Sequence, residues 1–571
     1  MIVKDSMNTT RHFQMRENKG KILYAICIAI IIALSNLITL SVYAPLPGDE
    51  SGYIAQAAFL AGKNWSETTS QLAFYAFGEG LVANILFRFI SDPIILYRSL
   101  LFLNTLLLCG TFVLIEKSVK LILNIRNDTF TLAISLLTVI IPSNILYSNQ
   151  FLAENYITFI FIALVYLYIM LNKCPKTIYV ILYIALSIYI IAIHQRMIGF
   201  GVLCISMLII LLWRRKINVR QVIIAVIILG ILVFSYIYYK QYVKLNLWGN
   251  SVYGNKNDFS SLAPSILDRF TADNILVVLK NLVGKIWYIT VSTCGFATIG
   301  IGVMTCKSIF QIRKIKKDDQ YNILLFLTCT FWISIIVVTG LSSYPARIDH
   351  IFIGRYMDAL LGPFFIYGIY WIYRHKDRKT YLYIIILALF LGNFVEKYAE
   401  EVVEQTDYVD KMSNTGLIAF LNDPFRNGDM INITLIYISI MVLIYIMILC
   451  NKKLIFFVLG TIFLLNIYAG NNLYLEYQKQ DERGLREIVN LLDEEEDEAT
   501  IAFLYKNIYA CILQYMTPDT RFELIEIEEL ANCEHKYILL KDGQIKQENM
   551  PEQYSLIMEN ELCSLYKLRT N

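Results

Sequence analysis

Two adjacent acids, Asp49 and Glu50, follow a long apolar stretch, in the segment PLPGDESGYIAQAAFLAG that covers residues 45–62. A carboxylate in such a position can take a proton from a hydroxyl group that attacks an electrophilic carbon. Packing alone does not require two neighbouring carboxylates at the start of a small-residue, amphipathic segment. We therefore treat Asp49 and Glu50 as candidate catalytic residues, and the sequence leaves open which of them is the base.

Further ionisable residues interrupt apolar surroundings later in the chain. Such residues are costly near a membrane and tend to be functional. The alternative for each cation alone is an interfacial side chain that reaches toward water. They are Glu154 in NQFLAENY, His194 and Arg196 in AIHQRMIGF, and Arg347, Asp349, His350 and Arg355 in YPARIDHIFIGRYMDALLGP.

This inventory of acids and cations suits a sugar donor carried on a polyprenyl phosphate. The lipid tail of such a donor lies in the bilayer, and its phosphate lies at the depth of the head groups. A carboxylate takes the proton of the acceptor hydroxyl as it attacks the anomeric carbon, and arginines or histidines hold the phosphate while its charge grows. Because phosphate leaves without protonation, the acid and base pair of most glycosidases is unnecessary. One carboxylate and a cationic cluster are sufficient.

The elements that position these residues are expected to be membrane helices. The chain of 571 residues is 57% hydrophobic and only 17% charged, whereas soluble domains carry about 25% charged residues. A helix needs about 20 apolar residues to cross a bilayer. The sequence predicts an α-helical polytopic membrane protein with thirteen spans, at 22–43, 94–115, 128–147, 153–172, 177–194, 197–213, 219–239, 284–305, 321–341, 353–373, 380–395, 432–450 and 454–470.

The basic residues give these spans a direction. Lys and Arg concentrate in short cytoplasmic connections, and every connection on one side is basic if the N-terminus is cytoplasmic, as in WRRK (213–216) and RHKDRK (374–379). This arrangement places the first outer loop, residues 44–93, on the extracytoplasmic side. Glu154, His194, Arg355 and their neighbours fall on the same side. An odd number of spans also places the C-terminal segment outside.

The chain divides into three expected parts. Residues 1–21 form a basic cytoplasmic N-terminus, residues 22–470 form the membrane domain, and residues 471–571 form a small extracytoplasmic α/β domain. In the last part, TIAFLY, RFELIEI, HKYILLK and CSLYKLR are typical of strands, and KNIYACILQYM is typical of a helix. In the first outer loop, YIAQAAFLAG and FYAFGEGLVANILFRFI indicate interfacial helices. These helices either plug the top of the bundle or frame a groove for a lipid head group and a soluble substrate.

At these residues the chain resembles the GT-C integral-membrane glycosyltransferases, which include protein O-mannosyltransferases, aminoarabinose transferases of lipid A and bacterial proteins like dolichyl-phosphate-mannose transferases. The first-loop pattern GDESGYIAQAAFLAGKNW carries most of the resemblance. Shorter matches are Ala153-Glu154 at the top of a span, Arg196, GKIWYITVSTCGFATIGIG at 284–302, and Gly354, Arg355 and Tyr356 ahead of Pro363. In architecture the resemblance covers about residues 20–470.

The resemblance implies a GT-C-like bundle and an inverting transfer of a hexosyl or pentosyl group from a polyprenyl-phosphate sugar. It implies that Asp49 is the catalytic base, with Glu50 as its partner or substitute. The residues that it implies as contacts of the donor phosphate are Arg196 and Arg355, with Arg347, His194 and Tyr356 beside them.

Some members of the group need a divalent cation, which further acids in the outer loops bind. Here Glu154 and Asp349 are the acids that could serve, and Tyr53 stands with them as an acceptor contact. A complete metal set is not visible in the sequence, and no other cofactor is expected. The expected partners are the polyprenyl-phosphate sugar, membrane lipids, and a glycan, lipid-linked or protein acceptor. No nucleic acid is expected.

Two other classes of membrane protein remain as alternatives. A transporter or lipid flippase favours inverted repeats and charged residues near the middle of the membrane; no repeat relates the halves of this chain, and its ionisable residues gather at one rim. A cell-surface polysaccharide polymerase or ligase also has many spans, but its largest loop comes late and is rich in arginine. Here the loop that carries the acids comes first.

Overall fold

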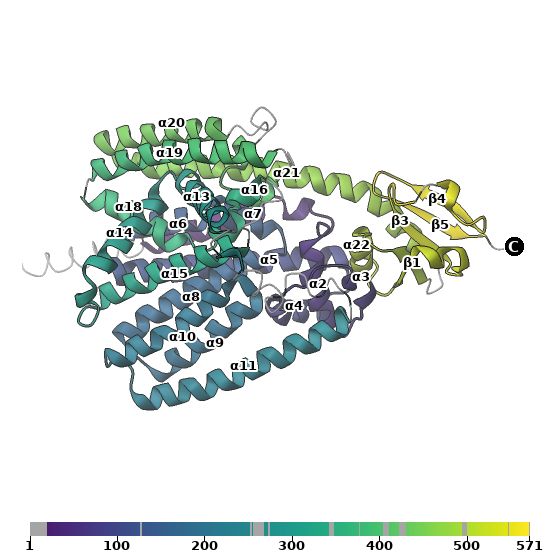
Figure 1. Ribbon diagram of the computed structural model, residues 1–571, viewed down its shortest axis with the longest axis horizontal. Helices are drawn as coiled ribbons and strands as arrows, with labels where there is room; N and C mark the ends of the chain where they lie inside the picture. Colours follow the sequence, from purple (N-terminus) through teal and green to yellow (C-terminus); the bar gives the residue numbers. More distant parts are fainter. Residues whose placement is uncertain are drawn as a thin grey trace, which may run out of the picture.

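The computed structural model describes residues 20–125, 128–249, 251, 254, 258, 268–271, 274–341, 348–375, 377–403, 410–421, 430–493, 500–545 and 547–569. It consists of a large helical bundle with a small sheet domain at one end (Figure 1). A long helix, α21 (Leu454–Asp493), begins in the bundle and reaches the sheet domain, so the position expected for the domain boundary, after residue 470, lies inside one continuous helix.

Most of the bundle consists of helices that can cross a membrane. In the described part of the chain, ten helices are long and apolar enough, or eleven if α6 with α7 and η2, bent by 59°, counts as one span. These ten are Gly20–Ser41, α5 (Pro93–Leu123), α8 (Ala153–Lys173), η3 with α10 (Gln195–Trp213), α11 (Val219–Leu247), α13 (Ile275–Ser292), α15 (Asp319–Leu341), α19 (Arg378–Val403), α20 (Met430–Cys450) and α21. The chain is therefore a multi-pass membrane protein, as predicted.

The remaining elements of the bundle are shorter. They include two apolar helices, α9 (Thr177–Ile193) and α14 (Phe296–Phe310). The others are α6 (Asp128–Val139), α7 (Pro142–Leu146), η2 (Tyr147–Asn149), η5 (Ile312–Lys314), α16 (Asp349–Phe352), α17 (Arg355–Asp358), α18 (Gly362–His375), η6 (Met412–Asn414) and η7 (Ile418–Phe420). Two of the ten spans include a 3-10 turn, η1 (Thr39–Ser41) and η3 (Gln195–Met197).

Several predicted spans differ from the observed helices. The stretch 284–305 is not one helix, because the backbone turns at Cys294 and Gly295, both with positive φ, between α13 and α14. The stretch 353–373 contains a full helix only from Gly362, and α17 precedes it. Three predicted spans are missing from the ten helices: 128–147 is bent by 59° between α6 and α7, α9 at 177–194 is a shorter apolar helix, and 353–373 is broken before α18. A hydropathy pattern does not register a turn within an apolar run.

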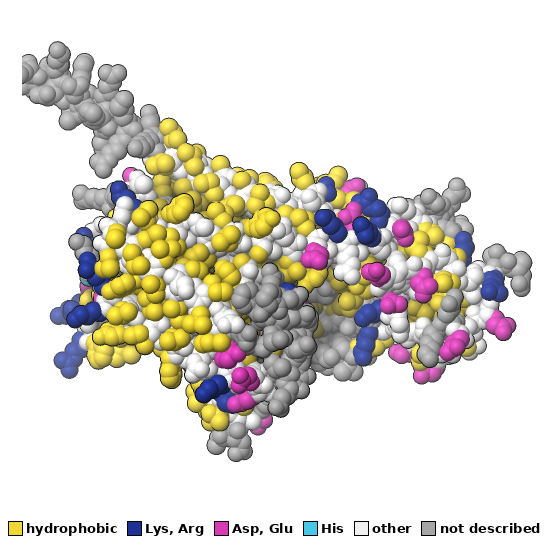
Figure 2. Space-filling model, turned by 90° about the horizontal axis from the view of Figure 1, so that it is seen from above, with side chains coloured by type: hydrophobic (Ala, Val, Ile, Leu, Met, Phe, Trp, Pro, Cys, Tyr) yellow, Lys and Arg dark blue, Asp and Glu magenta, His cyan; other side chains and the backbone are white. Residues whose placement is uncertain are grey.

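The surface of the bundle is apolar where lipid would cover it. Figure 2 shows hydrophobic side chains over the bundle and charged side chains at its far end and over the sheet domain. At the end away from the sheet domain, basic connections contact one another: Arg214 pairs with Asp319 at 2.7 Å, and Lys173 Nζ donates to the carbonyl of Leu121 at 2.6 Å. The basic connections predicted for one side of the membrane therefore meet at one end of the molecule.

The sheet domain is an α/β unit, as expected. Its strands are β1 (Thr500–Leu504), β2 (Arg521–Ile525), β3 (Tyr537–Lys541), β4 (Tyr554–Glu559) and β5 (Cys563–Leu568), in the order β2-β1-β3-β5-β4. β1 pairs in parallel with β2 and β3, and β5 pairs antiparallel with β3 and β4. The helix α22 (Tyr509–Met516) connects β1 to β2, as a parallel pair of strands requires. The short helices η9 (Ile527–Asn532) and η10 (Gln547–Asn549) complete the domain.

Residues 44–93, the first loop segment, lie between the bundle and the sheet domain and contain α2 (Asp49–Leu60), α3 (Ser66–Ser70) and α4 (Gly78–Phe89). α4 exposes Leu81, Val82, Ile85 and Phe89, as an interfacial helix does. α2 is largely buried. It packs closely on α4, because a Cβ atom at Gly80 would lie only 3.2 Å from the backbone nitrogen of Ala57.

Candidate functional site

A cavity of about 210 Å³, partly open to solvent, lies at the sheet-domain end of the bundle. Its walls come from α2, from residues 74–76 of the first loop segment, from the turn between α9 and α10, and from the start of α17. Segments far apart in the sequence therefore meet there. The residues that line it are Asp49, Tyr53, Phe74, Tyr75, Ala76, His194, Gln195, Arg196, Leu341, Arg355 and Tyr356.

Asp49 is the first residue of α2, and 47% of its side chain is exposed, toward this cavity. Gly48 precedes it with φ of +108°, a conformation that glycine adopts without strain. The hydroxyl of Tyr75 donates to Oδ1 at 2.7 Å, and Arg355 Nη1 donates to Oδ2 at 2.6 Å. Partial desolvation raises the pKa of Asp49, but Arg355 and the hydrogen bond from Tyr75 outweigh it, so the pKa lies below its usual value.

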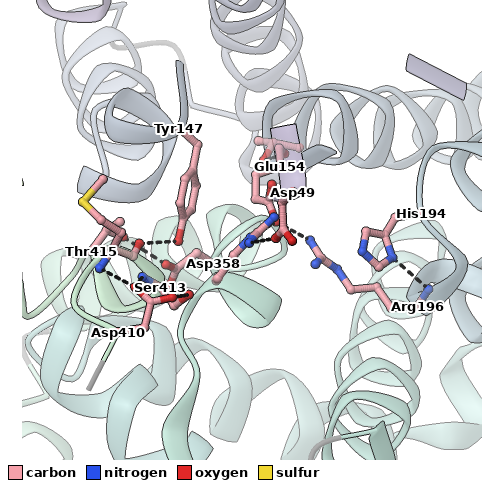
Figure 3. Close-up of polar contacts among 12 residues, drawn as sticks. Asp49, Tyr147, Glu154, His194, Arg196, Asp358, Asp410, Ser413 and Thr415 are labelled. Atoms are coloured by element: carbon pink, nitrogen blue, oxygen red, sulfur yellow. Dashed lines mark hydrogen bonds and ion pairs between the residues drawn. The ribbon is translucent and has the colours of Figure 1, made fainter. Parts of the chain in front are cut away.

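Glu154 joins two arginines beneath the cavity. It lies in the first turn of α8, with its side chain 3% exposed. Its Oε1 accepts from Arg355 Nε at 2.7 Å and from Arg196 Nη2 at 3.1 Å. A carboxylate this deeply buried is stable only with such partners. Asp49, Arg355, Glu154 and Arg196 therefore form one alternating row of charges. Figure 3 labels Asp49, Glu154 and Arg196 of this row.

Arg196 retains hydrogen-bonding capacity on the cavity wall. Its side chain is buried, and its guanidinium lies 4.9 Å from the centre of the Tyr356 ring. Within the described residues, its Nε and Nη1 atoms have no hydrogen-bond partner. Buried donors of a cation are costly to leave without acceptors.

His194 is a neutral donor in this arrangement. Its Nδ1 accepts a hydrogen bond from the backbone nitrogen of Arg196 at 3.2 Å, so the ring proton belongs on Nε2. Burial, together with the neighbouring Arg196 and Arg355, lowers the pKa of His194 well below its ordinary value. His194 can therefore donate to a ligand in the cavity without adding a positive charge.

Glu50 does not line the cavity, although it follows Asp49 in the chain. Its side chain points into the protein and the residue is 3% exposed. The carboxylate accepts from the hydroxyl of Tyr97, from the backbone nitrogen of Phe151 at 2.9 Å and from that of Leu46 at 3.3 Å. Burial raises the pKa of Glu50 to about 7, against the effect of these donors.

A second polar cluster holds α17, and with it Arg355. Gly354 donates its backbone N–H to Asn414 Oδ1 at 2.9 Å, and a Cβ atom at Gly354 would lie 2.0 Å from the ring of Tyr288. Asp358 accepts from the Tyr288 hydroxyl at 3.0 Å, and burial raises the pKa of Asp358 to about 7. Figure 3 shows Asp358 beside Thr415, which donates to the same oxygen at 3.3 Å. These contacts fix the short helix that presents Arg355 to Asp49.

The structure brings most of the sequence-predicted residues together. Asp49, Tyr53, His194, Arg196, Arg355 and Tyr356 line one cavity, and Glu154 bridges two of the arginines. Asp349 is buried in α16 and is not among the lining residues. Arg347 lies outside the described residues.

Sequence reasoning missed Tyr75, the hydrogen-bond partner of Asp49, and Phe74 beside it. It also missed Glu79, which is fully buried in α4 and whose pKa burial and the nearby Glu154 raise well above the usual value. The three residues belong to the aromatic stretch FYAFGEG. Its only acid, Glu79, lies in apolar surroundings, and such an acid indicates a functional segment.

The expected metal ligands do not converge in this arrangement. Asp49 and Glu154 share Arg355 between them, so a cation already occupies the space between the two carboxylates. Among the described residues, no group of three His, Cys, Asp or Glu side chains could hold a metal ion.

Two solved structures resemble the whole chain. ArnT from Cupriavidus metallidurans bound to undecaprenyl phosphate has a TM-score of 0.51 and 8% sequence identity, over 95% of this chain and 97% of ArnT. ArnT in the apo state has a TM-score of 0.53 and 8% identity, over 96% of this chain and 98% of ArnT. Both are GT-C proteins. The chain has the GT-C fold.

The GT-C fold confirms the architecture that the first-loop pattern implied. No protein-family model and no curated protein matches the sequence. The likeness is therefore one of three-dimensional arrangement, and it includes the sheet domain, because almost all of both chains superpose.

Proposed function

We propose that this protein is a membrane glycosyltransferase that moves a sugar from a polyprenyl-phosphate donor to an acceptor hydroxyl. One observation carries the proposal: Asp49, with its half-exposed carboxylate, and Arg196, whose buried Nε and Nη1 donors have no partner, line the same cavity. A base and an anion site on one wall are what this reaction requires. The GT-C fold supports the proposal, since one ArnT structure with this fold holds undecaprenyl phosphate.

Arg196 is the proposed anchor of the donor phosphate. Its Nε and Nη1 atoms are unpartnered donors that point in different directions in the plane of the guanidinium, and a phosphate that accepts from either of them forms a charge-assisted hydrogen bond. Tyr356 supports the guanidinium from one side. His194, whose Nδ1 accepts from the backbone nitrogen of Arg196, is the proposed second donor through Nε2. As the bond to the sugar breaks, charge accumulates on the phosphate, and these contacts strengthen.

Asp49 is the proposed base. Its lowered pKa keeps it ionised at neutral pH, which is the state that accepts a proton. Tyr75 and Arg355 occupy one lone pair on each oxygen, so each oxygen retains another. The acceptor hydroxyl gives its proton to Asp49 and forms a bond to the anomeric carbon. The bond from that carbon to the phosphate breaks, and the phosphate leaves with the electron pair. A single displacement of this kind inverts the anomeric centre.

The proposed sidedness follows from the basic connections. They meet at the end of the bundle away from the cavity and the sheet domain. The positive-inside rule makes that end cytoplasmic, so the cavity and the C-terminal domain face outward. In a variant without native cysteines, Asp519→Cys should react in whole cells with a membrane-impermeant maleimide, and Arg313→Cys should react only after lysis. The opposite pattern would reverse the orientation.

The test of the proposed function is a chromosomal Asp49→Asn substitution, which keeps the shape of the side chain and removes the base. Surface glycans and polyprenyl-phosphate sugars are measured by mass spectrometry, with membrane levels of the protein checked. We expect one sugar to disappear from a glycan, a lipid-linked glycan or a glycoprotein while its lipid donor accumulates. Asp318→Asn, the same change at an exposed residue at the opposite end of the bundle, is the matched control.

An unchanged profile in the Asp49→Asn strain, where full deletion alters it, would reject Asp49 as the base. Accumulation of a complete but unpolymerised or unattached glycan would instead favour the polymerase or ligase alternative. Accumulation of an intact lipid-linked intermediate on the cytoplasmic side would favour a flippase. The accumulating species therefore distinguishes the three classes.

A further inference from the structure

We propose that Glu50 is a positioning residue through which α21, the helix that carries the sheet domain, sets the geometry of Asp49 and Glu154. This inference rests on the proposed function for its catalytic consequence. The physical coupling between α21 and α2 does not depend on that function, and it can be measured separately.

The starting observation is a directed chain of hydrogen bonds that ends at Glu50. Gln478 Nε2 donates to the Tyr474 hydroxyl at 3.3 Å, and the hydroxyls of Tyr474 and Tyr97 lie 3.2 Å apart. The Tyr97 hydroxyl donates to Glu50 Oε2. All four side chains are buried. Each group can donate to the next toward the carboxylate, and such chains strengthen each other in a medium of low polarity.

Glu50 connects to both acids that hold Arg355. It is the neighbour of Asp49 in the first turn of α2. The same oxygen that accepts from Tyr97 also accepts the backbone N–H of Phe151, three residues before Glu154. One buried carboxylate thus fixes the start of α2 and the start of α8. A shift of either start would change the distances from Arg355 to Asp49 and to Glu154, now 2.6 and 2.7 Å.

The other end of the chain is anchored in α21. Gln478 also forms hydrogen bonds with the backbone that leads into the first loop segment. Its Oε1 accepts from the nitrogen of Tyr43 at 3.2 Å, and its Nε2 donates to the carbonyl of Ala44 at 2.7 Å. Two turns further on, Asn560 of the sheet domain donates to the carbonyl of Gly484 at 2.9 Å. A Cβ atom at Gly484 would lie 2.7 Å from Leu562, so helix and sheet domain are in close contact there.

The sheet domain also contacts the first loop segment directly, through hydrogen bonds and an ion pair. Tyr515 of α22 donates to the carbonyl of Pro93 at 2.7 Å, and Gln71 Nε2 donates to the carbonyl of Asn507 at 2.9 Å. Lys63 pairs with Asp519 at 2.9 Å. The segment that carries Asp49 is therefore held at both its entry, by Gln478, and its exit, by Tyr515. The sheet domain is a structural part of the catalytic unit in this arrangement.

The first test measures the coupling without any substrate. Hydrogen exchange of the α2 amides is compared in full-length wild type, Tyr474→Phe and Tyr468→Phe. Tyr468 lies on the same helix with 68% exposure, so its variant loses the same hydroxyl without touching the chain of hydrogen bonds. We expect exchange in α2 to rise about 3- to 10-fold in Tyr474→Phe and to stay at the wild-type rate in Tyr468→Phe. Equal exchange in both variants would overturn the proposal.

The second test separates positioning from chemistry at Glu50. Glutamine keeps an oxygen that accepts from Tyr97 and Phe151, whereas leucine removes it. A positioning role predicts that Glu50→Gln retains sugar transfer within about 10-fold of wild type and that Glu50→Leu falls by about 100-fold or more. If Glu50→Gln is as inactive as Asp49→Asn, Glu50 takes part in the chemistry and the proposal is wrong. If Glu50→Leu does not reach the membrane, the comparison of Glu50→Gln with Asp49→Asn still tests whether Glu50 takes part in the chemistry, and the exchange experiment tests the positioning role.

These two tests fail independently of the proposed function. If Asp49→Asn leaves all glycans unchanged where full deletion alters them, Asp49 is rejected as the base, while the exchange experiment still reports on the coupling of α21 to α2. If the glycan changes as expected but hydrogen exchange in α2 is the same in Tyr474→Phe as in wild type, the proposed function stands and the positioning role of α21 is rejected.

Discussion

Asp49 and Glu50 are adjacent in the chain, yet their carboxylates lie in opposite environments. The side chain of Asp49 is 47% exposed at the cavity and bonded to Arg355 at 2.6 Å, whereas Glu50 is 3% exposed and bonded to Tyr97 and to two backbone N–H groups. Consecutive residues of an α-helix point about 100° apart. A pair of acids in the first turn can therefore serve two purposes, one facing substrate and one facing the protein.

Arg196 provides the first prediction. Arg196→Gln removes the charge that is proposed to hold the donor phosphate, and a charge-assisted hydrogen bond contributes about 1.5–3 kcal/mol. We expect the affinity of the purified protein for undecaprenyl phosphate to fall about 10- to 100-fold, as measured by native mass spectrometry. Arg220→Gln, at the exposed start of α11, should bind like wild type. Unchanged binding in Arg196→Gln would show that Arg196 does not bind the donor phosphate.

Arg355 provides the second prediction. Arg355→Met leaves Asp49 and Glu154 near each other without the cation between them, and Arg196 remains the partner of Glu154. Removing one partner of a buried ion pair costs about 3–5 kcal/mol; the retained Arg196 and the exposure of Asp49 reduce this to about 2 kcal/mol. We expect a lower thermal midpoint in detergent and loss of sugar transfer. A variant with wild-type stability would show that the row of charges contributes little to folding.

Gly52 provides the third prediction. A Cβ atom at Gly52 would lie 2.1 Å from the Tyr75 ring, so Gly52→Ala displaces the residue that donates to Asp49. Tyr75→Phe should lower sugar transfer about 10-fold, because a hydrogen bond to a charged group is lost, and Gly52→Ala should lower it at least as much. Gly302→Ala is the control, since no atom lies within 4 Å of its added Cβ. Transfer at the wild-type rate in Gly52→Ala would show that the position of Tyr75 is unimportant.

The pH dependence of stability provides the fourth prediction. Burial raises the pKa of Glu50 to about 7 from 4.5. A pKa that is higher in the folded state contributes stability below the unfolded value, and this contribution is lost as the pH rises through the folded value. Between about pH 5 and pH 8, wild type should lose on the order of 1–3 kcal/mol more than Glu50→Gln. Thermal midpoints of the two proteins across this range measure the difference, and parallel curves would contradict a Glu50 that titrates near neutral pH.

The membrane bundle and the first-loop acids could be predicted from the sequence, because each depends on local composition. Long apolar runs indicate membrane spans, and the acids of GDES directly follow such a run. Lone charged residues such as Glu154, Arg196 and Arg355 were found for the same reason. Their meeting at one cavity was expected only as a shared side of the membrane, because sequence periodicity carries no information on which helices are neighbours.

The residues that these side chains contact could not be predicted from the sequence. Tyr75 contacts Asp49 from 26 positions away and Arg355 from 306, and neither separation has a sequence signal. The pairing of Arg355 with Asp49, where a phosphate contact was expected, depends on the turn at Gly354 and on Tyr288 and Asn414 from other elements. The breaks at Gly295 and before α18 likewise lie within apolar stretches.

The sequence by itself determined that this is a multi-pass membrane protein with a C-terminal α/β domain and acids at the entry to its first loop, because hydrophobicity and alternation are properties of single segments. Only the tertiary structure decided that Asp49 faces the cavity while Glu50 faces Tyr97, that two arginines share Glu154, and that α21 reaches the first loop segment. Those relations follow from the packing of helices that are distant in the chain. A single charged side chain acquires its role from the neighbours that such packing gives it.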